Sequence, residues 1–253
     1  MIIKHNILAL IPARMGSSRF PGKPMAELIG KPMIGHVYDN VKKNELIKEL
    51  AVATCDYEIY NYIESIGGRA VMTSNKHERA SDRCAEALLT IEKIDNIIYD
   101  IIVMVQGDEP MVHENMITQA VQPMLDDQNV IVTNLLGKIV RKEEFEDRNC
   151  IKVVCDMKND ALYFSREPIP TRSKTNDVPM GKQICVIPFR RDFLLDYNKL
   201  EPTPLEKAES VDMMRVLEHG MKVRMVQTEY DTHAVDTELD LIEVEKLLAG
   251  KKK

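Results

Sequence analysis

The sequence has few cysteines, and none of them stand in a CxxC spacing. The five lie at positions 55, 84, 150, 155 and 185. An odd and scattered set of this kind is typical of reduced thiols that pack as small core residues, not of a disulfide framework. We therefore expect free cysteines and a cytoplasmic location.

Long apolar runs and an excess of positive charge are also missing. The longest apolar stretch, residues 97–105, is too short to span a bilayer and contains Asp100. Residues 1–13 lack the small-residue cleavage site of a signal peptide. With a formal net charge of -6, the chain offers no general basic surface. We expect neither nucleic acid nor membrane as a partner.

The chain of 253 residues has 44% hydrophobic residues, which suffices to bury a full core. In its first half, short β-branched runs alternate with segments of helical periodicity. The runs predict strands at 6–11, 49–54, 69–72, 100–106 and 129–135, and helices at 32–44, 57–66, 81–94 and 114–127. This alternation predicts an α/β fold with a mostly parallel sheet covered by helices on both faces.

The pattern changes after about residue 150. We expect a hairpin from 151–155 and 161–164, a polar loop over 171–181, and a strand over 183–189. A helix over 204–220, a strand over 222–228 and a last helix over 238–248 follow. We interpret 1–253 as a single domain in which residues of roughly 150–215 form an inserted subregion.

Three polar clusters are expected at the carboxyl ends of strands, where ligands bind in such sheets. They are IPARMGSSRFPGKP at 11–24, VQGDEP at 105–110 and AVDTELD at 234–240. The first places Arg14, Arg19 and Lys23 among small residues, although Pro24 rules out a Walker A motif and GxGxxG is absent. Such a loop is suited to phosphate, and the alternative is a basic surface turn.

The carboxylates of the other two clusters suggest a metal. Asp108 follows the predicted strand directly after Gly107. A carboxylate at this position is well placed to bind an Mg²⁺ ion that also contacts phosphate oxygens. The alternative for Asp108 is a turn or helix cap, and Asp236 with Thr237 is also a good helix start. Together with the cationic loop, the two aspartates favour a metal–triphosphate site. No Ser-His-Asp or Cys-His arrangement follows from spacing.

The motifs IPARMGSSRFPGKP, VQGDEPMV, ALYFSREPIP, PTPLEKAE and AVDTELDL occur in this order. Together they closely resemble the 3-deoxy-manno-octulosonate cytidylyltransferase (CMP-Kdo synthetase) family, over about residues 6–248. The resemblance implies a Rossmann-like nucleotidyltransferase fold and a homodimer formed through the later subregion. It implies an Mg²⁺-dependent reaction in which the anomeric hydroxyl of a sugar acid attacks the α-phosphorus of CTP, giving a CMP-sugar and pyrophosphate for lipopolysaccharide or capsule biosynthesis.

The same resemblance assigns roles to residues. It implies catalytic roles for Arg14, Lys23 and Asp108 and metal ligation by Asp108 and Asp236. It implies nucleotide binding by Ala13, Arg14, Gly16, Ser17, Ser18, Arg19, Lys23, Thr73, Ser74 and Gly107. It implies sugar-acid binding by His77, Arg83, Gln106, Arg166, Gln183 and Asp212. By residue type alone, the segment around His77 is a solvated helix start.

Three segments depart from the family pattern. HERASDR at 77–83 stands where the family typically has HQSGTER, and it keeps His77 and Arg83. At 183–189 the chain has QICVIPF in place of HLGIYGY, so Gln183 and Ile187 replace a His and a Tyr of the sugar pocket. Asp212-Met213 replaces a Glu-Gln pair.

Because a site that hydrogen-bonds substrate hydroxyls discriminates strongly, these changes suggest an acceptor other than standard Kdo, such as 8-amino-Kdo. The alternatives are a divergent Kdo enzyme, a cytidylyltransferase for a nonulosonate or a phosphonate, and a catalytically silent nucleotide-binding regulator.

Overall fold

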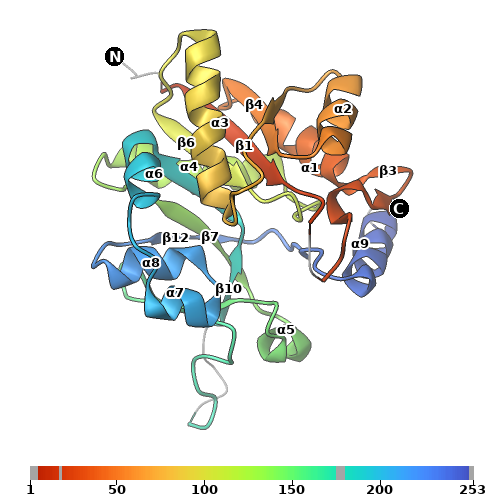
Figure 1. The fold of residues 1–253 in the computed structure, drawn as a ribbon. Helices are drawn as coiled ribbons and strands as arrows, with labels where there is room; N and C mark the ends of the chain where they lie inside the picture. The colour runs from red at the N-terminus through yellow and green to blue at the C-terminus, as the bar shows by residue number, and fades with distance from the viewer. Residues whose placement is uncertain (1–4, 17–18, 175–179, 251–253) are drawn as a thin grey trace. The chain divides into compact units, whose positions relative to one another are not determined.

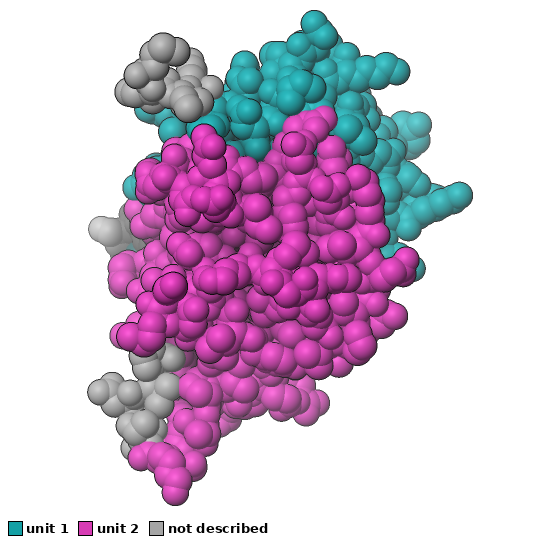
Figure 2. Space-filling view, turned by 90° about the vertical axis from the view of Figure 1, so that its left-hand side faces the viewer, with its two compact units in different colours: residues 1–118, 232–253 teal, residues 119–231 magenta. Residues whose placement is uncertain are grey.

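The computed structural model describes residues 5–16, 19–174 and 180–250. They form two compact units, coloured separately in Figure 2. Unit 1 comprises residues 1–118 and 232–253, and unit 2 comprises residues 119–231. Within the described ranges, no helix is both long enough and apolar enough to cross a membrane. All five cysteines are free.

Unit 1 is built on parallel strands in the order β6-β1-β4-β5 (Figure 1). These are β1 (Ile7–Ala13), β4 (Glu49–Thr54), β5 (Ala70–Met72) and β6 (Ile101–Val105). Every residue of β1 and β6 is buried, as expected of parallel strands covered on both faces. The predicted parallel βαβ arrangement is thus what the first half forms.

The helices of unit 1 follow the predicted periodicity closely. They are α1 (Met33–Lys42), α2 (Tyr57–Ser65) and α3 (Ala80–Asp95), all of which pack against β4. Gly67, at φ +69°, ends α2 as a left-handed glycine, and the next amide donates to the Ile63 carbonyl. α4 (Glu114–Asp126) starts in unit 1 and continues into unit 2.

The segment between β1 and α1 contains a short 3₁₀ helix, η1 (Lys23–Met25), and the strand pair β2 (Glu27–Leu28) and β3 (Lys31–Pro32). The last helix, α9 (Glu238–Gly250), belongs to unit 1. Val244 of α9 packs in a cluster with Leu28, Met33 and Val235. The C-terminal helix is therefore fixed to the region that follows the opening loop.

Unit 2 contains a mixed sheet in the order β12-β7-β10-β8-β9. The strands are β7 (Thr133–Lys138), β8 (Lys152–Cys155), β9 (Ala161–Ser165), β10 (Gly181–Ile184) and β12 (Arg224–Thr228). Only the β12–β7 pair is parallel among these neighbours. The β8–β9 pair confirms the predicted hairpin. The strand predicted at 129–135 starts later than expected, at Thr133. Of the predicted loop at 171–181, residues 175–179 lie outside the described residues.

The single strand predicted at 183–189 is wrong, because the structure has β10 and then β11 (Val186–Arg190). Ile184 pairs with Leu135, and Phe189 forms a bridge with Val132. Between these two pairs, residues 185–188 of one segment stand opposite only residues 133–134 of β7. The surplus residues bulge out of register. Asn134 fills the bulge by donating to the Ile184 carbonyl at 2.7 Å.

The single helix predicted at 204–220 is also wrong. The structure has α7 (Pro204–Glu209) and α8 (Asp212–Glu218), separated by Ser210 at φ +52°. Two further helices that the sequence patterns missed are α5 (Lys142–Glu146) and α6 (Arg191–Tyr197). A buried ion pair joins α7 to α8: Arg215 donates to Glu206 at 2.6 and 2.7 Å. This ion pair holds the two short helices together.

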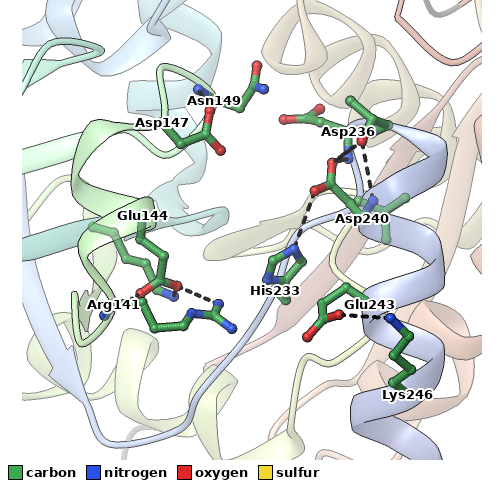
Figure 3. A network of polar contacts seen from close by, with 12 residues as sticks. Arg141, Glu144, Asp147, Asn149, His233, Asp236, Asp240, Glu243 and Lys246 are labelled. Carbon is green, nitrogen blue, oxygen red and sulfur yellow. Dashed lines mark hydrogen bonds and ion pairs between the residues drawn. The ribbon is translucent and has the colours of Figure 1, made fainter.

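A second buried ion pair in unit 2 involves Glu144 of α5. Its carboxylate accepts hydrogen bonds from Lys182 at 2.6 Å and Arg141 at 2.9 Å (Figure 3 shows Arg141 and Glu144). Burial alone would raise the pKa of Glu144, but the hydrogen bonds and charges of Lys182 and Arg141 outweigh burial and lower the pKa from 4.5 to about 2.

We predict that Glu144→Gln flattens the pH dependence of stability. The depressed pKa stabilises the fold above about pH 4.5, and that stabilisation is lost as pH falls from there toward about 2. Urea unfolding at a series of pH values should therefore give a shallower slope for Glu144→Gln than for the wild type in this window. Glu143→Gln, at an exposed neighbouring position, should keep the wild-type slope. Equal slopes for all three proteins would contradict the prediction.

Candidate functional site

A cavity of about 290 Å³ lies within unit 1, where β1 and β6 end. It brings together ten residues that the resemblance assigned to the site: Ala13, Arg14, Gly16, Arg19, Lys23, His77, Arg83, Gln106, Gly107 and Asp108. Pro12, Pro24, Glu78, Arg79 and Ala80 complete the lining. The opening loop, the end of β6 and the segment before α3 therefore share one cavity.

The opening loop is held by contacts within unit 1. The Met15 amide donates to the Asp56 carboxylate at 2.8 Å, and the Gly22 amide donates to the Met15 carbonyl at 3.0 Å. Gly22 has φ +74°, which a residue with a side chain rarely adopts. Arg14 and Arg19 are exposed at the cavity. Ser17 and Ser18, assigned to the nucleotide, lie outside the described residues.

Lys23 lies between the two predicted metal ligands. Its Nζ donates to Asp108 Oδ2 at 2.8 Å and is 3.3 Å from Asp236 Oδ1. It also donates to the Val235 carbonyl at 2.7 Å. The side chain is only 12% exposed. Burial lowers the pKa of Lys23, but the charges of Asp108 and Asp236 outweigh burial and leave the pKa raised, so the ammonium stays protonated.

Asp236 is free to face these cations because its neighbour performs the capping. Thr237 and Asp240 form a reciprocal pair: the Asp240 amide donates to the Thr237 hydroxyl at 3.2 Å, and the Thr237 amide donates to the Asp240 carboxylate at 2.8 Å. The Asp236 carboxylate instead pairs with Arg19 at 3.0 Å, as well as with Lys23. The helix-cap alternative therefore holds for Thr237.

Asp240 is a positioning residue that sequence reasoning missed. Its carboxylate accepts the Asp236 amide at 3.0 Å and lies 3.4 Å from His233 Nε2 (Figure 3). Burial raises the pKa of Asp240, but these hydrogen bonds and those from Thr237 outweigh it and lower the pKa. The signal in the sequence was the T-x-x-D spacing, which is that of a capping box.

Gly107 allows β6 to end close to β1. A Cβ at this position would lie 3.1 Å from Ile34 Cδ1 and 3.2 Å from the Pro12 carbonyl oxygen. Both contacts are tighter than side chains normally make, and the second is to backbone that cannot move aside. The Asp108 carbonyl then accepts the Val235 amide at 2.9 Å. This main-chain hydrogen bond, together with the Lys23 ammonium, brings Asp108 beside Asp236.

Arg83 is buried at the wall of the cavity, with 3% of its surface exposed. Its Nη1 donates to the Thr73 hydroxyl at 2.5 Å and to the Ser74 carbonyl at 3.5 Å. Its Nη2 is buried and has no hydrogen-bond partner among the described residues. Thr73 and Ser74, which were assigned to the nucleotide, do not line the cavity; they orient Arg83.

Glu86 of α3 is a second residue that sequence reasoning missed, and no motif marks it. Its carboxylate accepts the Ser74 amide at 2.9 Å and contacts His77 Nε2. Burial raises the pKa of Glu86, but the Ser74 amide, His77 and Arg83 outweigh burial and lower it. Glu86 therefore fixes the His77 imidazole and the chain before it.

The remaining predicted residues belong to unit 2. Gln183 donates to Asn134 Oδ1 at 2.6 Å, and Asp212 is the first residue of α8, where its carbonyl accepts the Tyr197 hydroxyl at 2.9 Å. Arg166 follows β9 and donates to main-chain carbonyls of its own unit. Their participation in the same site as the unit 1 cavity stays a prediction.

Comparison with known proteins decides the family. A model of the family described as cytidylyltransferase matches residues 8–223. This chain belongs to the cytidylyltransferase family. The 3-deoxy-manno-octulosonate cytidylyltransferase of Geobacter metallireducens is 44% identical over 96% of this chain and 98% of its own length. The enzyme of the same name from Geotalea uraniireducens is 42% identical over 98% of this chain and 100% of its own.

A solved structure is also similar to this cytidylyltransferase. A CMP:2-keto-3-deoxy-manno-octonic acid synthetase in complex with CTP superposes with a TM-score of 0.87 at 35% identity, over 97% of this chain and 99% of that one. The predicted family, the α/β nucleotidyltransferase fold with a mixed, mostly parallel arrangement of strands, and the enzyme class are confirmed.

We predict that Asp240→Ala weakens the start of α9 and disturbs Asp236. Loss of a capping interaction costs about 1 kcal/mol in the free energy of unfolding. Hydrogen–deuterium exchange of the α9 amides should become faster, because the first turn loses its acceptor. Glu243→Ala is the matched control on the same helix, since Glu243 forms only an exposed pair with Lys246 at 3.5 Å (Figure 3). Unchanged exchange in Asp240→Ala would show that Asp240 does not hold this turn.

Proposed function

We propose that this cytidylyltransferase couples CTP to a 3-deoxy-manno-octulosonate-type sugar acid, releasing pyrophosphate and giving a CMP-sugar. The observation that carries the proposal is the cavity of unit 1. Arg14, Arg19, Lys23 and Asp108 line it, and Asp236 pairs with Arg19 and Lys23. The names of the relatives support the choice of nucleotide and acceptor, because they are 3-deoxy-manno-octulosonate cytidylyltransferases of nearly the same length.

The cations of the opening loop would bind the triphosphate. Nucleotidyl transfer needs positioning and charge neutralisation more than a protein nucleophile, because negative charge spreads over the phosphate oxygens in the transition state. Arg14 and Arg19 are exposed at the cavity and can pair with phosphate oxygens through planar guanidinium groups. Lys23 would add the positive charge of its ammonium beside the same oxygens, while its hydrogen bonds hold Asp108 and Asp236.

Asp108 and Asp236 would hold Mg²⁺. Both carboxylates already meet one cation, Lys23 Nζ, at 2.8 and 3.3 Å. Mg²⁺ needs only one or two carboxylates when substrate phosphates and water supply its other ligands. Among the described residues no group of three or more His, Cys, Asp or Glu side chains is placed for a metal, so a two-carboxylate site fits better than a protein cage. Bound Mg²⁺ would neutralise the charge that develops on the phosphates.

The acceptor would be oriented so that its anomeric hydroxyl attacks the α-phosphorus of CTP. The P–O bond to the β-phosphate breaks and pyrophosphate leaves. In unit 1, Gln106, His77 and the Nη2 of Arg83, which has no partner among the described residues, offer polar contacts at the cavity. Arg166, Gln183 and Asp212 of unit 2 would provide the further contacts implied by the resemblance. The single-domain organisation, dimerisation through residues of roughly 150–215 and the cytoplasmic location stay predictions.

The acceptor is tested by pyrophosphate release with CTP and Mg²⁺ across Kdo, 8-amino-Kdo, nonulosonic acids and phosphonates. Although the departures from the family pattern suggest another acceptor, we expect Kdo to be turned over efficiently, because the relatives at 44% and 42% identity are 3-deoxy-manno-octulosonate cytidylyltransferases. Turnover restricted to 8-amino-Kdo would support the altered-acceptor hypothesis, and turnover of a nonulosonate or phosphonate alone would move the protein to another acceptor class. CTP binding without release from any acid would indicate a silent nucleotide-binding protein.

We predict that Asp108→Asn lowers kcat on the order of a hundredfold or more while the Kd for CTP changes far less, because charge develops in the transition state. Initial rates of pyrophosphate release and calorimetric titration with CTP measure the two quantities. Asp39→Asn, an exposed aspartate of the same unit paired with Lys31, should leave both unchanged. Near-normal turnover by Asp108→Asn would remove Asp108 from the metal site.

A further inference from the structure

Lys152 of β8 carries a fully buried ammonium in unit 2. Its Nζ donates to three main-chain carbonyls: Asp147 at 2.7 Å, Cys150 at 2.7 Å and Arg166 at 2.6 Å. An ammonium has three N–H donors, so each donor meets one acceptor. The acceptors come from the loop before β8 and from the end of β9.

This arrangement is costly, and packing does not require it. Burial lowers the pKa of Lys152, since the charged form loses its hydration. A methionine would fill a similar volume without burying a charge, but it would take away the donor that the three carbonyls share. The ammonium is therefore best explained by what its three hydrogen bonds hold in place.

The guanidinium of Arg166 is held by the same loop before β8 and by the end of α7. Arg166 Nη1 donates to the Arg148 carbonyl at 2.8 Å. In the sequence, Arg148 lies between Asp147 and Cys150, the two loop residues whose carbonyls Lys152 binds. On the other side, Arg166 Nε donates to the Glu209 carbonyl at 2.5 Å, and its amide donates to the Glu209 carboxylate at 2.8 Å. Lys152 thus fixes both the main chain of Arg166 and the loop that orients its side chain.

The register of the sheet explains why one residue can do both. Lys152 pairs with Ser165 across the β8–β9 ladder, and Arg166 is the next residue along β9. Arg166 also places Nη2 3.4 Å from the Ser210 carbonyl. Of the five N–H donors of a guanidinium, these main-chain contacts use three. Within the part of the chain that the structure describes, the other two stay available for a bidentate carboxylate.

We infer that Lys152 is a positioning residue for acceptor recognition: it holds Arg166 and the loop of residues 147–150 in the geometry with which Arg166 receives the sugar-acid carboxylate. This rests on the proposed function, in which Arg166 faces the acid. It assigns to the β8–β9 end a part in acceptor affinity, whereas the residues that the resemblance gives to the nucleotide all belong to unit 1.

The test compares Lys152→Met with the wild type in pyrophosphate release, varying Kdo and CTP separately. Wild-type turnover of Kdo is established first, so failure of the proposed function is seen before any variant is made. We expect KM for Kdo to rise about tenfold, the effect of one misplaced charge-assisted hydrogen bond, with KM for CTP within about twofold. Lys222→Met, which removes an exposed ammonium paired with Asp160 in the same unit, should leave both KM values unchanged.

A double variant separates positioning from general destabilisation. If Lys152 acts through Arg166, adding Lys152→Met to Arg166→Ala should raise KM for Kdo no further. Additive effects, an unchanged KM for Kdo, or equal rises in both KM values would overturn the inference. Lys152→Gln keeps two donors without the buried charge and serves if the methionine variant does not fold. Failure of both variants to fold would assign Lys152 to folding alone and overturn the positioning role.

Discussion

The candidate site depends on a single buried ammonium. Lys23 contacts Asp108, Asp236 and the Val235 carbonyl, which lie 85, 213 and 212 residues away along the chain. Without a cation between them, two carboxylates that approach one point would repel each other and each would be costly to desolvate. Lys23 cancels that repulsion and at the same time fixes the opening loop to the end of β6 and to the start of α9.

The supporting contacts around this ammonium are mostly main-chain contacts. Val235 donates its amide to the Asp108 carbonyl, Asp240 accepts the Asp236 amide, and Asp56 accepts the Met15 amide. Main-chain partners fix position without competing for the side chains that face the ligand. This is why Asp236 remains available to the cations although it stands at a helix start, where aspartate usually caps.

Much of unit 1 could be predicted from the sequence because its signals are local. Continuous β-branched runs and helical periodicity located β1, β4, α1 and α2 to within a few residues. The failures in unit 2 have non-local causes. The bulge between β10 and β11 depends on register against β7, and the break between α7 and α8 depends on Ser210 at positive φ beside a buried Glu206–Arg215 pair. Neither register nor a buried partner is visible in a window of sequence.

The same distinction applies to the site. The motifs identified most of the residues that line the cavity, but they did not identify Glu86. This residue lies on α3, and its carboxylate contacts the Ser74 amide and the His77 imidazole in the segment before the helix. In the segment 77–83, residues that depart from the family pattern can now be compared with Arg83, which is retained. Glu78 and Arg79 line the cavity, so their identity bears on what enters it. Arg83, which the family pattern shares, has a buried contact with Thr73, and its Nη2 meets no partner in the described part of the chain. A buried guanidinium with an unmet donor is costly unless a ligand completes it. The lining of the cavity therefore keeps a buried guanidinium that a ligand can complete, while Glu78 and Arg79 change its chemistry.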